Sequence, residues 1–365
     1  MNRLRLLRPL LRTVFALAIL TPVSALAEPY LAVQSGLKCA QCHVNPTGGG
    51  LRTNFGNLWA QTQLAAKRLG AAEDPWTGQL GRLSIGGNLR ANYQTTKVPS
   101  QGSSNGFDLQ EARVFLDVAL IPNRLSVYLD ERVGPGNAEA LEANVRLWLR
   151  PGSVYLKAGQ FYLPYGWRLE DDNAFVRQLT GISMQTPDRG VEIGIDQGQW
   201  NAQLAVSNGT AGGPETDDGK QITARVEFVA GTWRLGASGM SNNSDAGDRM
   251  GLGLFAGYRW RQLSLLGELD WVEDDGLGQN GRRLWASHAE ANWRVRQGHN
   301  LKLSYEWFEP DRHVAEDAQA RTSLLYEWSP FEFVQARLGY RYFHGIPQND
   351  FQNRRELFLQ LHGYF

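Results

Sequence analysis

From residue 80 to the end of the chain, apolar and polar residues alternate along segments of about ten residues. In one segment Val114 and Leu116 fall on one parity, while Arg113 and Asp117 fall on the other. Successive side chains of a strand point to opposite faces, so each segment has the pattern of a β-strand with one apolar face. Sixteen segments follow it: residues 80–94, 108–120, 123–132, 139–150, 153–161, 189–197, 199–207, 220–229, 232–241, 249–260, 262–272, 283–296, 299–308, 319–329, 331–343 and 353–365.

The connections between these segments alternate in length. Tight turns fall at Pro122-Asn123, Pro151-Gly152, Gly198, Gly231, Arg261, Gln297-Gly298 and Ser329-Pro330, and every other connection is longer. A soluble β-sandwich also alternates apolar and polar residues, so this asymmetry decides between the two. Short turns on one rim, long loops on the other and an even strand number predict an all-β transmembrane barrel of the outer membrane, with about sixteen antiparallel strands over residues 80–365 and both ends in the periplasm.

Aromatic residues support a barrel surrounded by lipid. They share the apolar parity near strand ends: Trp200, Trp233, Trp260, Trp271, Trp285, Trp293, Trp307, Trp328, Tyr305, Tyr326, Tyr340 and Tyr342. Amphipathic rings at both lipid–water boundaries are typical of outer-membrane barrels, so outer-membrane lipid is an expected partner. The terminal Phe365 resembles the signal by which such barrels are recognised for assembly.

The opposite parity carries charges of both signs, which we expect to brace the lumen as a salt-bridge network. These residues are Arg90, Arg113, Arg146, Arg225, Arg234, Arg294, Arg321 and Arg337 with Glu111, Asp117, Asp130, Glu192, Glu227, Glu268, Asp270, Glu290 and Glu306. The longest connection, residues 162–188, is expected to fold into the lumen and narrow it. Gly159-Gln160-Phe161, Pro164-Tyr165-Gly166 and Asp188-Arg189-Gly190-Val191 resemble the phosphate-selective porin family, although the mixed charges do not favour selectivity for one sign.

Residues 1–27 have the pattern of a signal peptide. Arginines precede a short apolar core at 14–20, and Ala25-Leu26-Ala27 supplies small residues before a cleavage site. The chain has 37 basic and 37 acidic residues, and removal of this segment deletes four arginines and no acid. A mildly acidic mature chain gives no support to nucleic-acid binding. No apolar run reaches the 18 residues of a transmembrane helix.

The two cysteines lie in Cys39-Ala40-Gln41-Cys42-His43, the C-x-x-C-H pattern of covalent haem attachment. Two thiols reach the two vinyl groups of one haem c, and the following histidine becomes the proximal ligand of the iron. The alternative is a disulfide or redox pair, but no thioredoxin-like pattern surrounds these residues. We therefore predict a small monohaem segment over residues 28–79, followed by the barrel.

Apolar residues at helical spacing predict one helix after the glycine-rich loop 45–50, running from Leu51 to Leu69 with Gly70 as its cap. No His or Met lies between residues 44 and 79, so the sixth iron ligand is open. Either the iron is five-coordinate, or a residue farther along the chain supplies the sixth ligand. We weigh His362, which lies on the inward parity near the periplasmic rim, ahead of the other candidates, which are His299, His288, Met184, Lys67 and the new amino terminus.

A signal peptide, one C-x-x-C-H near the mature N-terminus and a sixteen-stranded barrel together resemble the fused monohaem cytochrome–porins of iron-oxidising bacteria. The residue-level resemblance is limited to Cys39, Cys42 and His43, extended by Phe55-Gly56. It implies electron transfer across the outer membrane between an extracellular donor or acceptor, such as Fe(II) or a mineral, and a soluble periplasmic cytochrome.

Two other functions compete with electron transfer. One is a passive solute or anion porin whose haem segment only plugs the barrel or acts as a sensor, and the other is a small-molecule haem enzyme. Acidic residues in the predicted outer loops, among them Asp217, Asp218, Asp245 and Asp248, can attract cations, but no ligand spacing recurs and a solvated surface is the simpler explanation.

Overall fold

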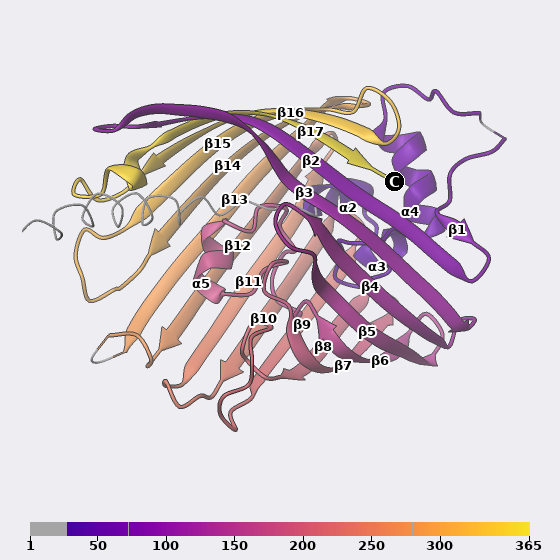
Figure 1. Ribbon diagram of the computed structural model, residues 1–365, viewed down its shortest axis with the longest axis horizontal. Helices are drawn as coiled ribbons and strands as arrows, with labels where there is room; N and C mark the ends of the chain where they lie inside the picture. The colour runs from indigo at the N-terminus through magenta and orange to yellow at the C-terminus, as the bar shows by residue number, and fades with distance from the viewer. Residues whose placement is uncertain (1–27, 72, 279–280) are drawn as a thin grey trace, which may run out of the picture.

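The computed structural model describes residues 28–71, 73–278 and 281–365, and the predicted signal peptide lies outside them. Sixteen antiparallel strands form a closed barrel in which each strand pairs with the next and β17 pairs with β2 (Figure 1). They are β2 (Leu83–Val98), β3 (Gly102–Ile121), β4 (Leu125–Gly134), β5 (Glu139–Arg150), β6 (Val154–Phe161), β7 (Asp188–Gln197), β8 (Trp200–Ser207), β9 (Gln221–Ala230), β10 (Trp233–Asn242), β11 (Arg249–Trp260), β12 (Leu263–Asp274), β13 (Arg282–Arg296), β14 (His299–Glu309), β15 (Gln319–Trp328), β16 (Val334–His344) and β17 (Arg355–Tyr364). The predicted fold class is confirmed.

One predicted connection is wrong. A long loop was expected between residues 94 and 108, but β2 and β3 continue as a paired hairpin that turns at residues 99–101. Thr96 pairs with Ser104 and Gln94 with Gly106 in this extension. Side chains on both of its faces are largely polar, so the alternation that identifies a half-buried strand is missing there.

The outer surface of the barrel carries an apolar belt between two rows of aromatic side chains. Leu252, Leu254 and Leu359 are more than half exposed, as is Trp260 near one rim. On β13, Trp285 and Trp293 lie eight residues apart and thus about 26 Å along the strand at ~3.3 Å per residue. That spacing suits the hydrocarbon layer crossed by a tilted strand. None of the described helices has the length and hydrophobicity needed to cross a membrane.

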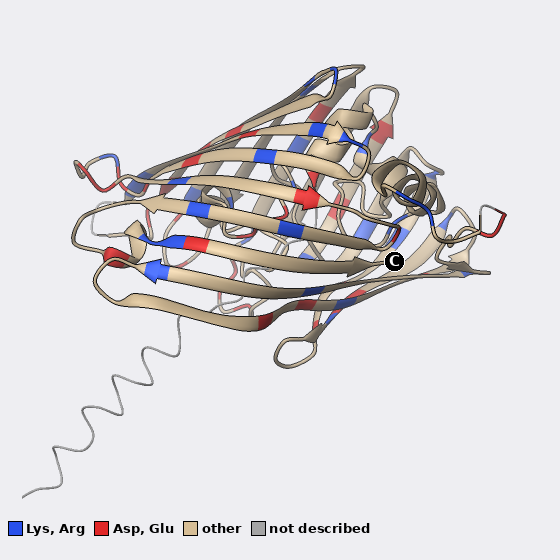
Figure 2. Ribbon diagram, turned by 90° about the horizontal axis from the view of Figure 1, so that it is seen from above, with Lys and Arg blue, Asp and Glu red and all other residues tan. Residues whose placement is uncertain are grey.

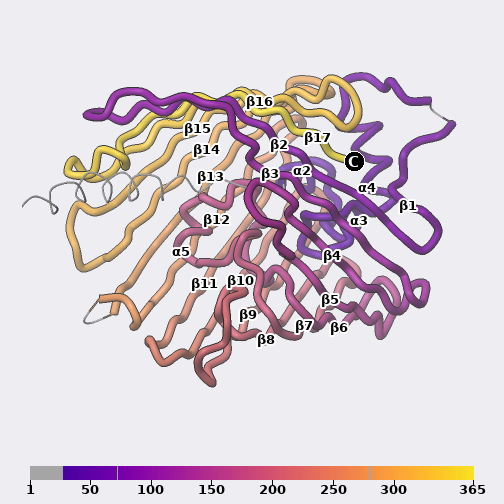
Figure 3. The backbone as a smooth tube through the Cα atoms, in the orientation of Figure 1, coloured from indigo at the N-terminus to yellow at the C-terminus, as the bar shows by residue number. Residues whose placement is uncertain are grey.

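The two rims differ as predicted. The short-turn rim uses residues with positive φ, including Asn123, Gly152, Gly198 and Arg261. On the long-loop side, the connection between β6 and β7 turns inward and carries the helix α5 (Phe175–Thr180). Figures 1 and 3 show α5 inside the ring of strands, toward the long loops.

The N-terminal segment lies within the barrel at its short-turn end, where α2 (Pro29–Ser35) and α3 (Cys39–Cys42) sit inside the ring of strands (Figure 3). They are followed by α4 (Asn54–Trp59), the π-helix η1 (Ala60–Leu64) and the short strand β1 (Gln79–Leu80), which pairs with β2. We call residues 28–70 the plug, because the segment crosses the lumen. Tyr30 and Val33 of the plug pack with Phe161 and Phe255 of the barrel wall in one buried core.

The predicted single helix from Leu51 to Leu69 is wrong at both ends. The helix starts at Asn54, where the Thr53 hydroxyl accepts a hydrogen bond from the Gly56 amide, and helical structure ends at Leu64. Beyond it the chain is extended along the rim, and the Ala66 amide donates to the Ser329 carbonyl at 2.8 Å. Pairing with a barrel turn replaces the last helical turns, and the plug sequence alone does not reveal that partner.

Candidate functional site

The two cysteines and the histidine are held by one helical turn and a tight reversal of the chain. The His43 amide donates to the Cys39 carbonyl at 2.9 Å, and the Thr53 amide donates to the Cys42 carbonyl at 2.9 Å. Between them the chain turns through Gly48, Gly49 and Gly50, whose φ angles are 98°, 76° and 63°. L-residues with side chains rarely adopt three such angles in succession, which explains the glycine run.

Gly56 allows α4 to pack directly on the cysteine turn. A Cβ placed on Gly56 would lie 2.0 Å from the Cys42 carbonyl oxygen, so only glycine fits there. Thr53 caps the same helix. Gly56 of the Phe55-Gly56 pair noted in the sequence therefore makes a contact that fixes the C-x-x-C-H turn against the following helix.

These residues line a cavity inside the barrel with about 1000 Å3 of space not filled by atoms, counted out to its opening. Cys39, Cys42 and His43 form part of its wall, and His362 of β17 lines the same cavity. The remaining wall comes from the plug, the inward loop and the strands, and includes Leu31, Ala32, Gly48, Gly49, Arg52, Gly56, Trp59, Ala60, Leu64, Arg90, Trp167, Arg168, Arg225, Gln335 and Tyr364.

The chemistry of the three motif residues fits a covalently bound haem. Both cysteines are free thiols, and burial, followed by the proximity of Cys39, raises the pKa of Cys42 to about 11. Burial, followed by the charge of Arg52, lowers the pKa of His43 to about 3. His43 is therefore a neutral imidazole at physiological pH, which is the form that ligates a metal. Its Nδ1 is buried and has no hydrogen-bond partner among the described residues.

His362 is the histidine outside the motif that lines this cavity. It is buried, with Nδ1 3.3 Å from the Gln335 Oε1 and Nε2 3.4 Å from the Asn88 Oδ1. The other side chains weighed as sixth ligands lie elsewhere. His288 is enclosed by Glu290 and Glu306, at 3.5 and 3.7 Å.

The three further candidates are also outside the cavity wall. His299 stacks beside Trp328 at the short-turn rim, with ring centroids 6.3 Å apart. Met184 is buried in a separate apolar cluster, and Lys67 is bridged to Phe331 on the rim. Glu28, the residue expected to carry the new amino terminus, does line the cavity, so it stays a candidate beside His362.

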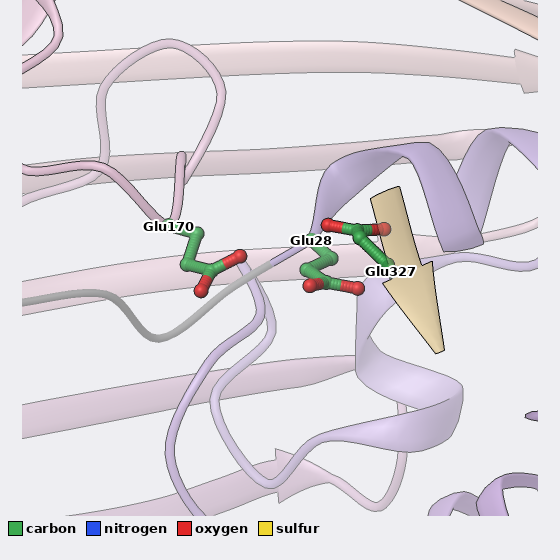
Figure 4. A group of neighbouring side chains, drawn as sticks. All are labelled: Glu28, Glu170 and Glu327. Atoms are coloured by element: carbon green, nitrogen blue, oxygen red, sulfur yellow. The ribbon is translucent and has the colours of Figure 1, made fainter. Parts of the chain in front are cut away.

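Three carboxylates from different parts of the molecule converge next to the cavity (Figure 4). Glu28 belongs to the plug, Glu170 to the inward loop and Glu327 to β15, and one oxygen from each lies within 4.8 Å of the others. Arg337 pairs with all three, and Lys302 lies 3.3 Å from Glu327. Arg90 also pairs with Glu170, so three cations balance three acids and the cluster ties the plug, the inward loop and the barrel wall together.

The inward loop is fixed to the lumen wall by further charged contacts. The Phe175 amide donates to Glu306 at 2.8 Å, and Arg177 pairs with Glu268. The predicted inward folding of residues 162–188 is thereby confirmed. The predicted salt-bridge lumen is confirmed as well, and Figure 2 shows basic and acidic residues interspersed along the strands. In addition to these charges, the plug and apolar side chains of the inward loop and the strands fill much of the lumen.

Several residues of the site were not identified from the sequence. Arg52, Trp167 and Arg168 line the cavity from the plug and the inward loop, and Lys302 and Glu170 complete the carboxylate cluster. The sequence could have indicated that Lys302 points into the lumen, since this residue falls on the inward parity of its strand. Loop residues have no strand parity, and the sequence gives no direction for their side chains.

Comparisons with known proteins show the fold. No protein-family model matches the chain, and no relative was found among curated proteins. A loop L8 deletion mutant of the outer-membrane protein OmpT of Vibrio cholerae is structurally similar, with a TM-score of 0.60 and 12% identity over 78% of this chain and 99% of that chain. The outer-membrane channel DcaP of Acinetobacter baumannii has a TM-score of 0.60 and 10% identity over 78% and 97%.

A third structure is an anion-selective porin from Comamonas acidovorans, with a TM-score of 0.59 and 12% identity over 78% of this chain and 99% of that chain. The chain thus has the barrel fold of outer-membrane porins. At 10–12% identity these comparisons establish the fold, and they carry no information about a haem.

Proposed function

We propose that this chain is an outer-membrane barrel that holds one haem c in its lumen and transfers electrons between an extracellular donor or acceptor and a periplasmic carrier. One observation carries the proposal: Cys39, Cys42 and His43 line a cavity inside a closed barrel, and His362 lines the same cavity. The apolar belt between two aromatic rows supports an outer-membrane location.

The residues of the cavity have distinct tasks in this proposal. Haem supplies reversible one-electron chemistry at its iron. Cys39 and Cys42 would hold the haem covalently, and the neutral imidazole of His43 and, on this proposal, His362 would serve as ligands of its iron. Leu31, Trp59 and Trp167 exclude water, while the plug keeps the motif at the short-turn end.

The barrel matters because one haem cannot bridge an insulating layer about 30 Å thick by itself. A haem inside the lumen leaves less protein and lipid between the iron and the extracellular side than a haem bound on the periplasmic face would. A soluble cytochrome would approach from the short-turn rim, and Fe(II) or another extracellular donor would approach from the long-loop side. The direction of electron flow follows from the potentials of these partners.

A passive solute or anion porin is the second candidate, and the structural comparisons by themselves favour it. The structurally similar proteins include a channel and an anion-selective porin. In that case the plug, with or without haem, would serve only to restrict or sense passage. A passive porin conducts equally well after Cys39→Ser and Cys42→Ser, whereas an electron-transfer protein loses its redox activity.

Absorption spectroscopy tests the main proposal. The protein is isolated from outer membranes of cells with c-type haem maturation, and spectra are recorded oxidised, reduced with dithionite and after denaturation. Haem that stays attached after denaturation, and that external Fe(II) reduces in intact cells, is the expected result. Covalent haem that no external donor reduces would contradict electron transfer across the membrane. It would favour a haem segment that plugs the barrel or acts as a sensor. No covalent haem would overturn the cytochrome altogether.

A further inference from the structure

Two arginines in the wall of the cavity have no acidic partner among the described residues. The other charged side chains of the wall are paired: Lys38 with Asp196, Arg90 with Glu170, Arg225 with Glu227 and Glu28 with Arg337. Arg52 and Arg168 form no such pair with any carboxylate that the structure describes, although both line the cavity. Arg52 and Arg168 are therefore the two arginines of the wall that lie outside any described ion pair, although the charge of Glu142 acts on Arg168 from farther away.

Arg168, from the inward loop, has one nitrogen without a partner. It donates to the Thr47 hydroxyl at 2.6 Å, and its guanidinium carbon lies 4.7 Å from the centre of the Tyr162 ring. Its Nη1 is buried with no hydrogen-bond partner among the described residues. A buried donor without an acceptor is costly, so its presence points to a ligand that accepts the bond.

Arg52 reaches the cavity from the plug, directly beside the proposed iron ligand. Its backbone bridges to that of His43, and its guanidinium carbon lies 4.5 Å from the centre of the Tyr364 ring. Burial lowers the pKa of both Arg52 and Arg168, because it disfavours the charged form. The charge of Arg90 adds to this effect at Arg52, and the charge of Arg225 adds to it at Arg168. A carboxylate beside each guanidinium would offset these costs.

We propose that Arg52 and Arg168 each bind one of the two propionate carboxylates of the haem. The inference rests on the proposed function and adds to it the orientation of the cofactor. Guanidinium–carboxylate pairs are strong and directional in a low-dielectric cavity, and two arginines match two carboxylates in number and charge. With Cys39 and Cys42 holding the haem covalently, the two arginines would determine where its propionates lie.

The test measures the midpoint potential of the haem in the full-length protein carrying Arg52→Met, Arg168→Met or both. An unpaired propionate stabilises ferric over ferrous iron. Each substitution should therefore lower the ferrous-to-ferric ratio at a fixed potential about tenfold, which corresponds to about 59 mV for one electron. Covalent haem content should not change, because Cys39 and Cys42 hold the haem. The lysine variants, which keep the charge, should recover most of the shift.

Arg294→Met is the matched control. Arg294 donates to the Gln63 carbonyl of the plug at 2.7 Å but lies outside the cavity wall, so its loss should leave the potential unchanged. Covalent haem with the native potential in both cavity variants would overturn the propionate assignment and leave the proposed function intact. Added phosphate that shifts the native potential but not that of the variants would show that the arginines bind a free anion instead. No covalent haem in the native protein would defeat the proposed function itself.

Discussion

At the scale of single residues, the site depends on close backbone packing as well as on ligand chemistry. Gly56 is the strictest case, because the Cys42 carbonyl occupies the space that a Cβ would need. Gly56→Ala should destabilise the packing of α4 on the cysteine turn by about 1–3 kcal/mol, the usual cost of overpacking. Covalent haem incorporation should fall accordingly, as measured by haem absorbance per protein after denaturation.

Gly106→Ala provides the control for this substitution. A Cβ at Gly106 meets no atom within 4 Å, and its φ angle lies outside the positive range. That variant should incorporate haem normally. Equal incorporation by both variants would show that the contact between Gly56 and Cys42 does not hold the motif in place.

If His362 is the sixth ligand of the proposed haem, His362→Ala should convert a six-coordinate low-spin spectrum to that of a five-coordinate high-spin haem, while covalent haem content stays the same. His299→Ala, at the rim and outside the cavity wall, should leave the spectrum unchanged. A native spectrum that His362→Ala does not alter would exclude His362 and favour the amino terminus of Glu28.

The sequence identifies the local residues of the site but not those assembled by the fold. Cys39, Cys42 and His43 are adjacent in the chain, so their spacing alone predicts their chemistry. His362 could be ranked first because strand parity gives its direction and its position gives its rim. Arg52 and Arg168 lie in irregular segments where no periodicity gives a direction, and only the folded chain shows them in one cavity.

At the scale of elements, strand positions were predictable and the path of the plug was not. The predicted segments 139–150 and 249–260 coincide with β5 and β11, since lipid on one side and the lumen on the other impose a strict alternation. The path of the plug depends on its contacts with the barrel. Its last residues follow a turn more than 250 positions away, as in the hydrogen bond from the Leu69 amide to Glu332.

The contact with Glu332 makes this part of the plug sensitive to pH. Its carboxylate accepts hydrogen bonds from the Leu69 and Gly70 amides at 2.8 Å. Desolvation opposes ionisation, but these bonds outweigh it and lower the pKa of Glu332. A lowered carboxyl pKa contributes stability above its free value of about 4.3, and that contribution is lost as pH falls through the lowered pKa.

Glu332→Gln should therefore release residues 65–70 at neutral pH. Hydrogen exchange by mass spectrometry should speed up there about tenfold, because a hydrogen bond to a charged group contributes about 1.5 kcal/mol. In the native protein the same increase should appear only at acidic pH, below about 4. Glu316→Gln, in an outer loop, is the control. If neither the substitution nor acidic pH changes the exchange rate, the backbone pairing with Ser329 is sufficient to hold residues 65–70 on the rim.

At the scale of the whole molecule, the plug and the inward loop share one lumen and are joined by charge. Arg337 on β16 contacts Glu28 of the plug and Glu170 of the loop, while Tyr30 donates to Glu327 at 2.8 Å. Displacing the plug would leave Asp196 without Lys38 and Glu327 without the Tyr30 hydroxyl, which is unfavourable. The plug is thus part of the folded barrel, and a porin fold by itself does not imply an open pore here.

Ion conductance in planar bilayers separates a filled lumen from an open one. The full-length protein should conduct far less than an open porin, whereas a variant lacking residues 29–70 should conduct at least about tenfold more, since the plug crosses the lumen. Heat-dependent migration on gels would establish that both barrels are folded. Cys39→Ser with Cys42→Ser should keep the low conductance, because the contacts of Glu28 and Tyr30 hold the plug without haem. Full-length protein that conducts like an open porin would favour passive transport, and the lumen would then serve solutes rather than electrons.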